Sequence, residues 1–284
     1  MTTPSDCRPA DVSAVVCTMN SASSIEACLR SLREAGVGQI IVVDASSTDG
    51  TRDIASSLAD LLLDDAGSGL AQARNVGIAR TTGALVLNMG SDNVITTDAL
   101  EAMIHTLQVR QVQGVSARTR VVGGGYVSRA MHAWRSARFR PGPSLIIGTP
   151  TLFIGELLRA NPFNPATTVS DDSELCERWA TQFGARFEIS EASVDERGKS
   201  TWRETRIRCR MYGRSDEEIY RHGVAAGWGW RRRWRSITHP LRVDLMLPLT
   251  VLPWSDRLRY LPYLVAFTTL RYAGWIRACR RPGP

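Results

Sequence analysis

Two apolar runs near the start of the chain are separated by a segment with helical spacing. The runs cover residues 12–20 and 39–43, and each ends in polar side chains. The intervening residues 24–33 repeat apolar side chains at the spacing of one helix face, namely at Ile25, Cys28, Leu29 and Leu32. The pattern therefore predicts a strand, a helix and a second strand. In open α/β sheets ligands bind at the carboxyl ends of such strands.

An acidic residue, Asp44, stands at the predicted carboxyl end of the second strand, before a polar turn that contains glycine. A carboxylate at this position can accept a hydrogen bond from a ribose hydroxyl or a base N–H. Asp is also common after strands as a turn or cap residue, so both interpretations stay open. Asp49 is expected to cap the helix that starts near Thr51 rather than to bind a ligand.

Four motifs follow one another along the first part of the chain. They read VVDASSTDGT at residues 42–51, GLAQARNVG at 69–77, LVLNMGSDN at 85–93 and DDSELCER at 171–178. In this order and approximate spacing they resemble the family 2 glycosyltransferases. The resemblance implies an α/β fold, the Rossmann-like GT-A fold, with a single catalytic domain over residues 11–210. A flexible segment over residues 1–10 and a mostly helical tail over residues 211–284 would complete the chain.

The same resemblance implies a nucleotide-diphosphate sugar as donor. Thr18 and Asp44 would contact the base and ribose, with Arg74 close by. The alternative for Arg74 is an ordinary surface arginine. Ser91 and the loop residue Lys199 would also bind the donor, although Lys199 and its neighbour Arg197 fit equally well as solvated loop charges.

A divalent cation, Mn²⁺ or Mg²⁺, usually neutralises the diphosphate in this family and is held by an Asp-x-Asp motif. Here the motif reads Gly90-Ser91-Asp92, so its first acid is missing. Hard cations prefer oxygen ligands, and one carboxylate together with phosphate oxygens and waters suffices to bind one. Asp92 is therefore the expected metal ligand. The alternative is that Asp92 caps the next helix and the site is inactive or metal-free.

The general base is expected from the pair Asp171-Asp172. Acids at a helix N-terminus are stabilised by the helix dipole, which alone would explain the pair. A carboxylate within reach of an acceptor hydroxyl can also accept its proton. By resemblance Asp172 is that base, and Asp171 orients it or caps the helix. Glu174 and Arg178 are spaced as an exposed helical ion pair and are given no chemistry.

Residues 187–194 are predicted to form a further strand, followed by a loop over residues 195–202. Residues 121–140 lie between the metal and base motifs, where enzymes of this fold build the walls of the donor and acceptor sites. Within them, Gly123 to Gly125 lack the Gly-Lys-Ser/Thr of a phosphate-binding loop and are interpreted as a connector.

The net charge of +7 is unevenly distributed. Residues 1–200 carry 18 Lys and Arg against 22 Asp and Glu, a balance of −4, whereas residues 201–284 carry 17 against 6, a balance of +11. In the tail, residues 227–235 read GWGWRRRWR. Interleaved Arg and Trp are typical of an element that lies on an anionic membrane surface.

The longest uncharged run of the tail has eleven residues, about 16 Å as helix, whereas a bilayer core measures about 30 Å. The tail is therefore expected to lie on a membrane rather than to span it. One alternative is that its helices pack on the catalytic domain and the Arg residues face water. Nucleic-acid binding is the least favoured interpretation, because the sequence has no known nucleic-acid module.

The six Cys show no metal-ligand spacing and the four His share none, so the Cys are interpreted as reduced and the His as structural. Residues 1–10 lack the apolar core of a signal peptide. These features suit a cytoplasmic protein that is peripheral on the inner face of the cell membrane.

The expected reaction is inverting transfer of a sugar from the nucleotide-diphosphate donor to a hydroxyl of a lipid-linked or membrane-proximal acceptor. Two alternatives remain open. One is a GT-A protein that has lost turnover and acts as an assembly partner, which Gly90 favours and which Asp44, Asp92 and Asp172 disfavour. The other is a soluble glycosyltransferase that acts on a small metabolite.

Overall fold

The computed structural model describes residues 6–65, 67, 69–167, 171–198 and 201–280. The chain divides into two compact units. The first unit comprises Met1–Arg120 and Arg140–Gly198, and the second comprises Val121–Phe139 and Lys199–Pro284. Residue 210, where the catalytic domain is expected to end, lies inside one continuous helix, α8 (Trp202–Ala225).

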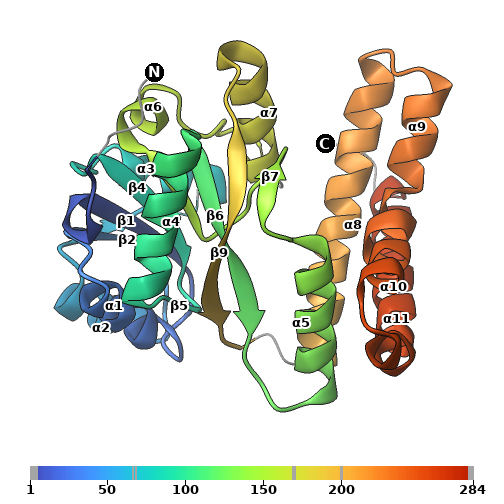
Figure 1. The fold of residues 1–284 in the computed structure, drawn as a ribbon, viewed down its shortest axis with the longest axis horizontal. Coiled ribbons are helices and arrows are strands. Elements are labelled where there is room, and N and C mark those ends of the chain that lie inside the picture. Colours follow the sequence, from blue (N-terminus) through green and yellow to red (C-terminus); the bar gives the residue numbers. More distant parts are fainter. Residues whose placement is uncertain (1–5, 66, 68, 168–170, 199–200, 281–284) are drawn as a thin grey trace. The chain divides into compact units, whose positions relative to one another are not determined.

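The first unit is built around a mixed sheet with the strand order β3-β2-β1-β4-β8-β6-β9-β5, in which β7 pairs with β9 (Figure 1). Its strands are β1 (Val12–Thr18), β2 (Gln39–Asp44), β3 (Leu61–Asp64), β4 (Leu85–Gly90), β5 (Asn93–Val94), β6 (Gly114–Val121), β7 (Gly142–Ser144), β8 (Thr151–Ile154) and β9 (Phe187–Glu196). Strands β3, β2, β1 and β4 are parallel, whereas β8 runs antiparallel to β4. The predicted strands at residues 12–20, 39–43 and 187–194 are confirmed.

The parallel half has the alternating strands and helices that the sequence predicts. The helices of the first unit are α1 (Ile25–Glu34), α2 (Thr51–Leu58), α3 (Leu70–Ile78), α4 (Thr97–Arg110), α6 (Gly155–Ala160) and α7 (Asp171–Phe183), with a 3₁₀ turn at Pro9–Asp11. Helix α3 lies directly on the sheet, because a Cβ at Gly77 would come within 2.5 Å of a Val15 methyl group. Residues 1–5 of the expected flexible segment lie outside the described residues.

Strand register brings the polar strand ends together. Thr18 of β1 is paired with Asp44 of β2, and Asp44 is paired with Asp64 of β3. On the other side of β1, Cys17 is paired with Gly90 of β4. Parallel strands keep their carboxyl ends at one edge of the sheet, so these positions share the edge where ligands bind in open α/β folds.

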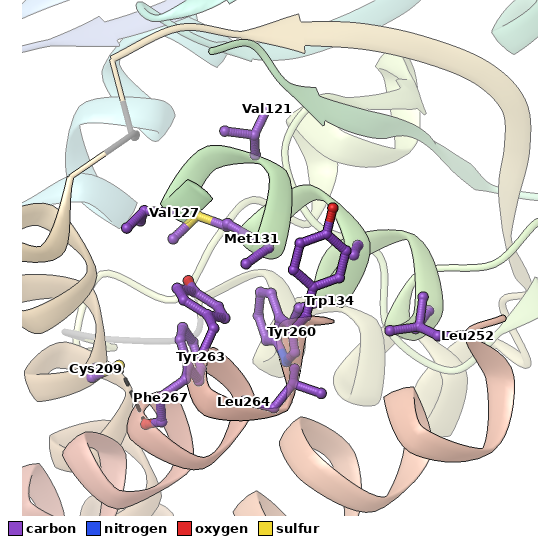
Figure 2. Packing of buried hydrophobic residues seen from close by; sticks show 13 residues of the cluster. Val121, Val127, Met131, Trp134, Cys209, Leu252, Tyr260, Tyr263, Leu264 and Phe267 are labelled. Carbon is purple, nitrogen blue, oxygen red and sulfur yellow. Dashed lines mark hydrogen bonds between the residues drawn. The ribbon is translucent and has the colours of Figure 1, made fainter. Parts of the chain in front are cut away.

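The second unit is helical. It contains α5 (Tyr126–Arg138), α8 (Trp202–Ala225), α9 (Trp230–Ile237), a π-helical segment (Leu241–Met246), α10 (Leu247–Val251) and α11 (Trp254–Cys279). Its apolar core, drawn in Figure 2, joins α5 to α8 and α11. The rings of Trp134 and Phe267 lie 4.6 Å apart between centroids. The aromatic side chains of α5 therefore share one core with those of α11, which belongs to the tail.

Two glycines set the spacing of the long helices α8 and α11. A Cβ at Gly213 would lie 2.2 Å from the backbone oxygen of Arg271, and one at Gly274 would lie 2.9 Å from the backbone oxygen of Cys209. Any side chain at Gly213 would push the two helices apart. The close approach explains why a glycine follows Tyr212 in the middle of α8.

Residues 121–139 belong to the second unit. Val127, Met131 and Trp134 bury their side chains in its core. Hydrophobic contacts with residues more than a hundred positions away thus hold this segment, and a role for it in the walls of the sugar sites stays a prediction.

A buried ion network ties the second unit together. Arg271 donates to both carboxylate oxygens of Asp216, at 2.6 and 2.7 Å, and to Asp244 at 2.7 Å. Asp244 also accepts from Arg138 at 2.9 Å and from the indole of Trp134 at 3.2 Å. Charges this deeply buried are tolerated because they are paired and hydrogen-bonded. The network links α5, α8, the π-helical segment and α11.

None of the described helices is long and apolar enough to cross a membrane. Helix α11 is the longest at 26 residues, but charged side chains interrupt its apolar sequence.

Candidate active site

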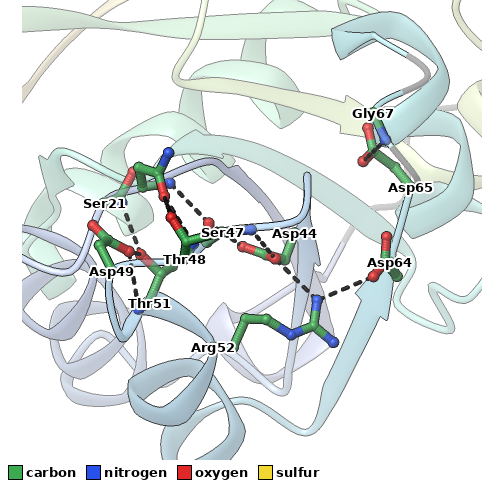
Figure 3. Close-up of polar contacts among 11 residues, drawn as sticks. Ser21, Asp44, Ser47, Thr48, Asp49, Thr51, Arg52, Asp64, Asp65 and Gly67 are labelled. Carbon is green, nitrogen blue, oxygen red and sulfur yellow. Dashed lines mark hydrogen bonds and ion pairs between the residues drawn. The ribbon is translucent and has the colours of Figure 1, made fainter.

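Two loops meet at the carboxyl ends of β1 and β2 (Figure 3). The amide oxygen of Asn20 accepts the backbone N–H of Thr48 at 2.9 Å, and the backbone N–H of Asn20 donates to the Ser47 hydroxyl at 2.8 Å. The Ser21 N–H donates to the Thr51 hydroxyl at 2.8 Å. These bonds hold the loop after β1 against the loop after β2, and the two form one preorganised ledge.

Asp49 lies one residue before Gly50, which is the N-cap of α2, so the expectation that Asp49 itself is the cap is wrong. Its carboxylate accepts the backbone N–H of Thr51 at 3.2 Å and that of Ala22 at 3.1 Å. The hydrogen bond from the Thr51 hydroxyl lowers the pKa of Asp49, and the backbone hydrogen bonds lower it further. The residue thus connects the start of α2 to the neighbouring loop.

Asp44 is completely buried and is held by its own turn. Its carboxylate accepts the backbone N–H of Ser47 at 2.9 Å, the Ser47 hydroxyl at 2.5 Å and the guanidinium of Arg52 at 2.9 Å. A carboxylate can accept about four hydrogen bonds, so these three donors use most of its capacity. The turn role of Asp44 is therefore observed, and its contact with a nucleoside stays a prediction.

Arg52 is a member of this site that the sequence interpretation missed. It bridges Asp44 to Asp64, at 2.9 and 3.2 Å, across neighbouring strand ends (Figure 3). Helix N-termini disfavour cations because of the helix dipole. An arginine in the first turn of α2 is thus unusual. Its position in the sequence could have predicted that a nearby carboxylate pairs with it.

Thr18 lies beside Asp44 in the sheet, and its side chain is buried at 5% exposure. Its hydroxyl makes no hydrogen bond within the described residues. A buried hydroxyl without a partner costs free energy of about 1–3 kcal/mol. A hydrogen-bonding group of a bound nucleoside would remove that cost, so the residue fits its expected role.

The motif Gly90-Ser91-Asp92 follows β4. The Ser91 hydroxyl donates to the Ser21 hydroxyl at 3.0 Å, which connects this motif to the ledge after β1. Asp92 is half-buried, and its backbone oxygen accepts the N–H of Arg197 at 2.8 Å. Helix α4 is capped by Thr96, whose hydroxyl accepts the N–H of Ala99 at 3.2 Å. The alternative that Asp92 caps this helix is therefore wrong.

The fit of a divalent cation at Asp92 depends on ligands supplied by the donor. No group of three His, Cys, Asp or Glu side chains suited to a metal occurs among the residues that the structure describes. Mg²⁺ is commonly bound through one or two carboxylates together with substrate phosphates and waters. A single carboxylate at this strand end fits that arrangement.

Asp171 and Asp172 begin α7 and share one guanidinium. Arg74 Nη1 donates to Asp171 at 2.6 Å and to Asp172 at 2.9 Å. Asp171 also accepts the backbone N–H of Asp172 at 3.1 Å. Burial raises the pKa of Asp172 to about 6, and the positive charge of Arg74 partly offsets this effect. A carboxylate with a pKa near neutrality suits a general base.

Arg74 is not a surface residue, because its side chain is only 7% exposed. Nη2 donates to the Thr149 hydroxyl at 2.7 Å, and the guanidinium carbon lies 4.9 Å from the centre of the Phe163 ring. Thr149 and Phe163 were not foreseen from the sequence. Neither residue belongs to a recognisable motif, and only the folded chain brings them to Arg74.

Two further expectations concern residues around this site. Lys199 lies outside the described residues. Glu174 and Arg178 form the predicted ion pair at 2.9 Å, but it is half-buried rather than exposed, and Arg178 also donates to the backbone oxygen of Pro162 at 2.6 Å.

Fold and site define an α/β protein whose polar side chains gather at the carboxyl ends of parallel strands, and comparisons with known proteins place it in a family. The family model "Glycosyl transferase family 2" matches residues 13–193. The chain belongs to this family, adopts the GT-A fold and is a glycosyltransferase. Comparison with curated proteins finds no match.

Solved structures are similar over most of the chain. A mannosyltransferase from Pyrobaculum calidifontis in complex with GDP-Man and Mn²⁺ is 21% identical, with a TM-score of 0.63, and the match covers 96% of this chain and 86% of that one. TarS residues 1–349 from S. aureus, in complex with UDP-GlcNAc, is 16% identical with a TM-score of 0.52, covering 93% of this chain and 89% of that one. At these identities the likeness establishes the shared fold.

Restoring the missing acid with Gly90→Asp should tighten Mn²⁺ binding several-fold in the presence of a nucleotide diphosphate. The backbone of Gly90 lies outside the left-handed region, so its conformation accepts a side chain. An added Cβ would lie 2.7 Å from Oδ1 of Asn93 and 2.9 Å from Oδ1 of Asp92, so both side chains would have to shift. The new carboxylate should also lower the melting temperature without metal, because it repels Asp92. Mn²⁺ should restore that temperature.

Calorimetric titration with Mn²⁺, together with melting curves, measures both effects. Gly90→Asn is the matched uncharged control, and Asp92→Ala should abolish metal-dependent nucleotide binding. A stable Gly90→Asp variant with unchanged Mn²⁺ affinity would show that position 90 does not face the metal.

Proposed function

We propose that this protein is an inverting glycosyltransferase that moves a sugar from a nucleotide-diphosphate donor to a hydroxyl of a lipid-linked or membrane-proximal acceptor. The observation that carries the proposal is the half-buried Asp172, whose pKa is raised to about 6 and whose carboxylate is held by Arg74. A base with these properties can take the acceptor proton as the new C–O bond forms.

The remaining residues bind the donor in this proposal. Thr18 and Asp44 hold the nucleoside, Ser91 lies beside the diphosphate, and Lys199 covers the diphosphate. Asp92 holds the divalent cation, Mn²⁺ or Mg²⁺, which when bound neutralises charge on the departing diphosphate. Asp172 removes the acceptor proton, while Asp171 and Arg74 keep its carboxylate in place. Support comes from the unpartnered Thr18 hydroxyl and from the link between Ser91 and the ledge.

Asp172→Asn should leave nucleotide-sugar binding nearly unchanged and lower turnover about 10²-fold or more, because a lost general base affects the chemical step. Calorimetry measures binding, and release of the nucleoside diphosphate measures turnover. Glu174→Gln, two residues further along α7, is the control. A variant that binds donor and keeps its full transfer rate would show that the base lies elsewhere.

The rate should rise with pH through about 6, since only the ionised form of Asp172 can accept the acceptor proton. The same titration affects stability in the opposite direction. The pKa of Asp172 is raised on folding, so Asp172 holds its proton more tightly in the folded protein than in the unfolded chain. The contribution of protonated Asp172 to stability is therefore lost as pH rises through about 6. Profiles of kcat/KM and of melting temperature against pH check both signs. In Asp172→Asn both effects should disappear.

The membrane part of the proposal rests on α9. This helix has no buried residue, and the side chains of Trp230 and Trp234 are 74% and 62% exposed. Their spacing of four residues places them on one face. Arg231, Arg232 and Arg233 lie between them. Trp at headgroup depth together with Arg near lipid phosphates is a typical interfacial arrangement, so we place the protein in the cytoplasm, peripheral on the inner face of the cell membrane.

An apolar surface near the base also favours a lipid-linked acceptor. Leu145 and Ile146 are 88% and 47% exposed. They precede Gly148, whose added Cβ would lie 4.0 Å from the Asp172 carboxylate. The Ser144 hydroxyl donates to the backbone oxygen of Ile146 at 2.7 Å and closes a turn that presents Leu145 to solvent. An acceptor hydroxyl at Asp172 would bring its carrier past these side chains.

The double variant Trp230→Ser/Trp234→Ser should no longer float with liposomes that contain anionic phospholipid, whereas the parent protein should float with them and not with neutral liposomes. The variant removes the Trp side chains that would insert into the membrane surface and keeps the Arg charges. It therefore tests insertion of Trp separately from electrostatic attraction to the anionic lipid. Val109→Ser, which removes an exposed apolar side chain of the first unit, is the control.

Absence of flotation by the parent protein would instead support a soluble enzyme that acts on a small metabolite. A catalytically impaired assembly partner is the other alternative, and Gly90 is the observation that favours it. Binding of nucleotide sugar without any turnover in the parent protein would support that alternative. We propose no nucleic-acid partner.

A further inference from the structure

We propose that Arg74 is the positioning residue for the base Asp172, and that it does not bind the donor. The inference rests on the proposed role of Asp172 as base. It differs from the role that the sequence suggested for Arg74, and it assigns the arginine of the GLAQARNVG motif to the acceptor side of the reaction.

Both terminal nitrogens of the guanidinium are already bonded to protein groups. Nη1 donates to both carboxylates of the acidic pair, and Nη2 donates to the Thr149 hydroxyl. The Phe163 ring lies against its face at 4.9 Å. With 7% of its side chain exposed, Arg74 presents little surface to a diphosphate. A planar guanidinium with two bonded nitrogens holds the carboxylates in one geometry.

Helix α3 itself is fastened to the segment that leads to the acidic pair. Asn75, the next residue, donates its amide N–H to the Phe163 backbone oxygen at 2.8 Å and accepts the Phe163 N–H at 3.0 Å. On the other side of α3, Gly77 lets the helix lie against the sheet. Arg74 is therefore delivered to Asp172 from a rigid support, as a positioning residue requires.

The positive charge of Arg74 affects the ionisation of Asp172. Asp172 is half-buried, with 21% of its side chain exposed, and it lies next to a second carboxylate. Both conditions favour its neutral, inactive form. Arg74 and the backbone N–H of Thr149 oppose this by favouring the ionised form. The nearby thiols of Cys17 and Cys176 have raised pKa values because they are buried, so they contribute no charge at neutral pH. Arg74 is thus the cation that keeps Asp172 ionised at physiological pH.

The test compares pH profiles of kcat/KM with nucleotide affinity in Arg74→Gln. An adjacent cation lowers a carboxyl pKa by about 1–3 units, so its removal should move the acidic limb of the profile to higher pH by at least about one unit. The affinity for nucleoside diphosphate with Mn²⁺, measured by calorimetry, should stay within about threefold, a change of less than 1 kcal/mol. A residue that only stabilises the fold would lower the melting temperature without moving the limb.

Two milder variants keep the test decisive if Arg74→Gln does not fold. Arg74→Lys retains the charge without the fork, and Thr149→Val removes only the Nη2 partner. Each should move the limb upward by less than Arg74→Gln. Arg178→Gln is the matched control, because Arg178 pairs with Glu174 on the same helix α7 and should leave the limb in place.

The outcomes separate this inference from the proposed function. Full turnover in Asp172→Asn overturns the base, whatever Arg74 does. A tenfold or greater loss of nucleotide affinity in Arg74→Gln, with an unmoved acidic limb, makes Arg74 a donor ligand and overturns the inference while the base stands. An unmoved limb in both Arg74→Lys and Thr149→Val also overturns it.

Discussion

Parallel pairing of β1 with β2 and β4 is the constraint on which the site depends. Parallel strands must be joined by crossover segments, so every strand of this half ends at the same edge of the sheet. Thr18, Asp44 and Gly90 come from different parts of the sequence and share that edge because of this topology alone. The loops after β1 and β2 then bond to each other and form one ledge.

Charge burial shapes the other half of the site. Asp171 and Asp172 lie where water is largely excluded, and such a pair persists as carboxylates only with a cation against it. Arg74 supplies the cation from α3, nearly a hundred residues earlier in the chain. In the second unit the acids Asp216 and Asp244 are likewise paired with arginines, namely Arg271 and Arg138. In both units the buried acids connect helices that are distant in sequence.

Membership of the family and the shared fold account for the strands, their order and the general position of the site. They leave the particular chemistry of this chain to its own residues. Gly90 stands at the first position of the Gly90-Ser91-Asp92 motif, and Leu145 presents an exposed apolar side chain. In the proposed function, metal preference and acceptor choice would depend on these two positions.

Local pattern by itself determined much of this protein. Apolar runs were sufficient for the strands β1 and β2, and apolar spacing was sufficient for the helix α1, because both patterns are properties of neighbouring residues. The acids at positions 44, 92 and 172 were proposed as site residues because each belongs to a motif. Tertiary structure alone decided that Arg52 would bridge Asp44 to Asp64, that residues 121–139 would join the tail, and that Arg74 would face the acidic pair. These contacts join residues far apart in the chain, and buried charge or apolar surface finds its partner only when the whole chain has folded.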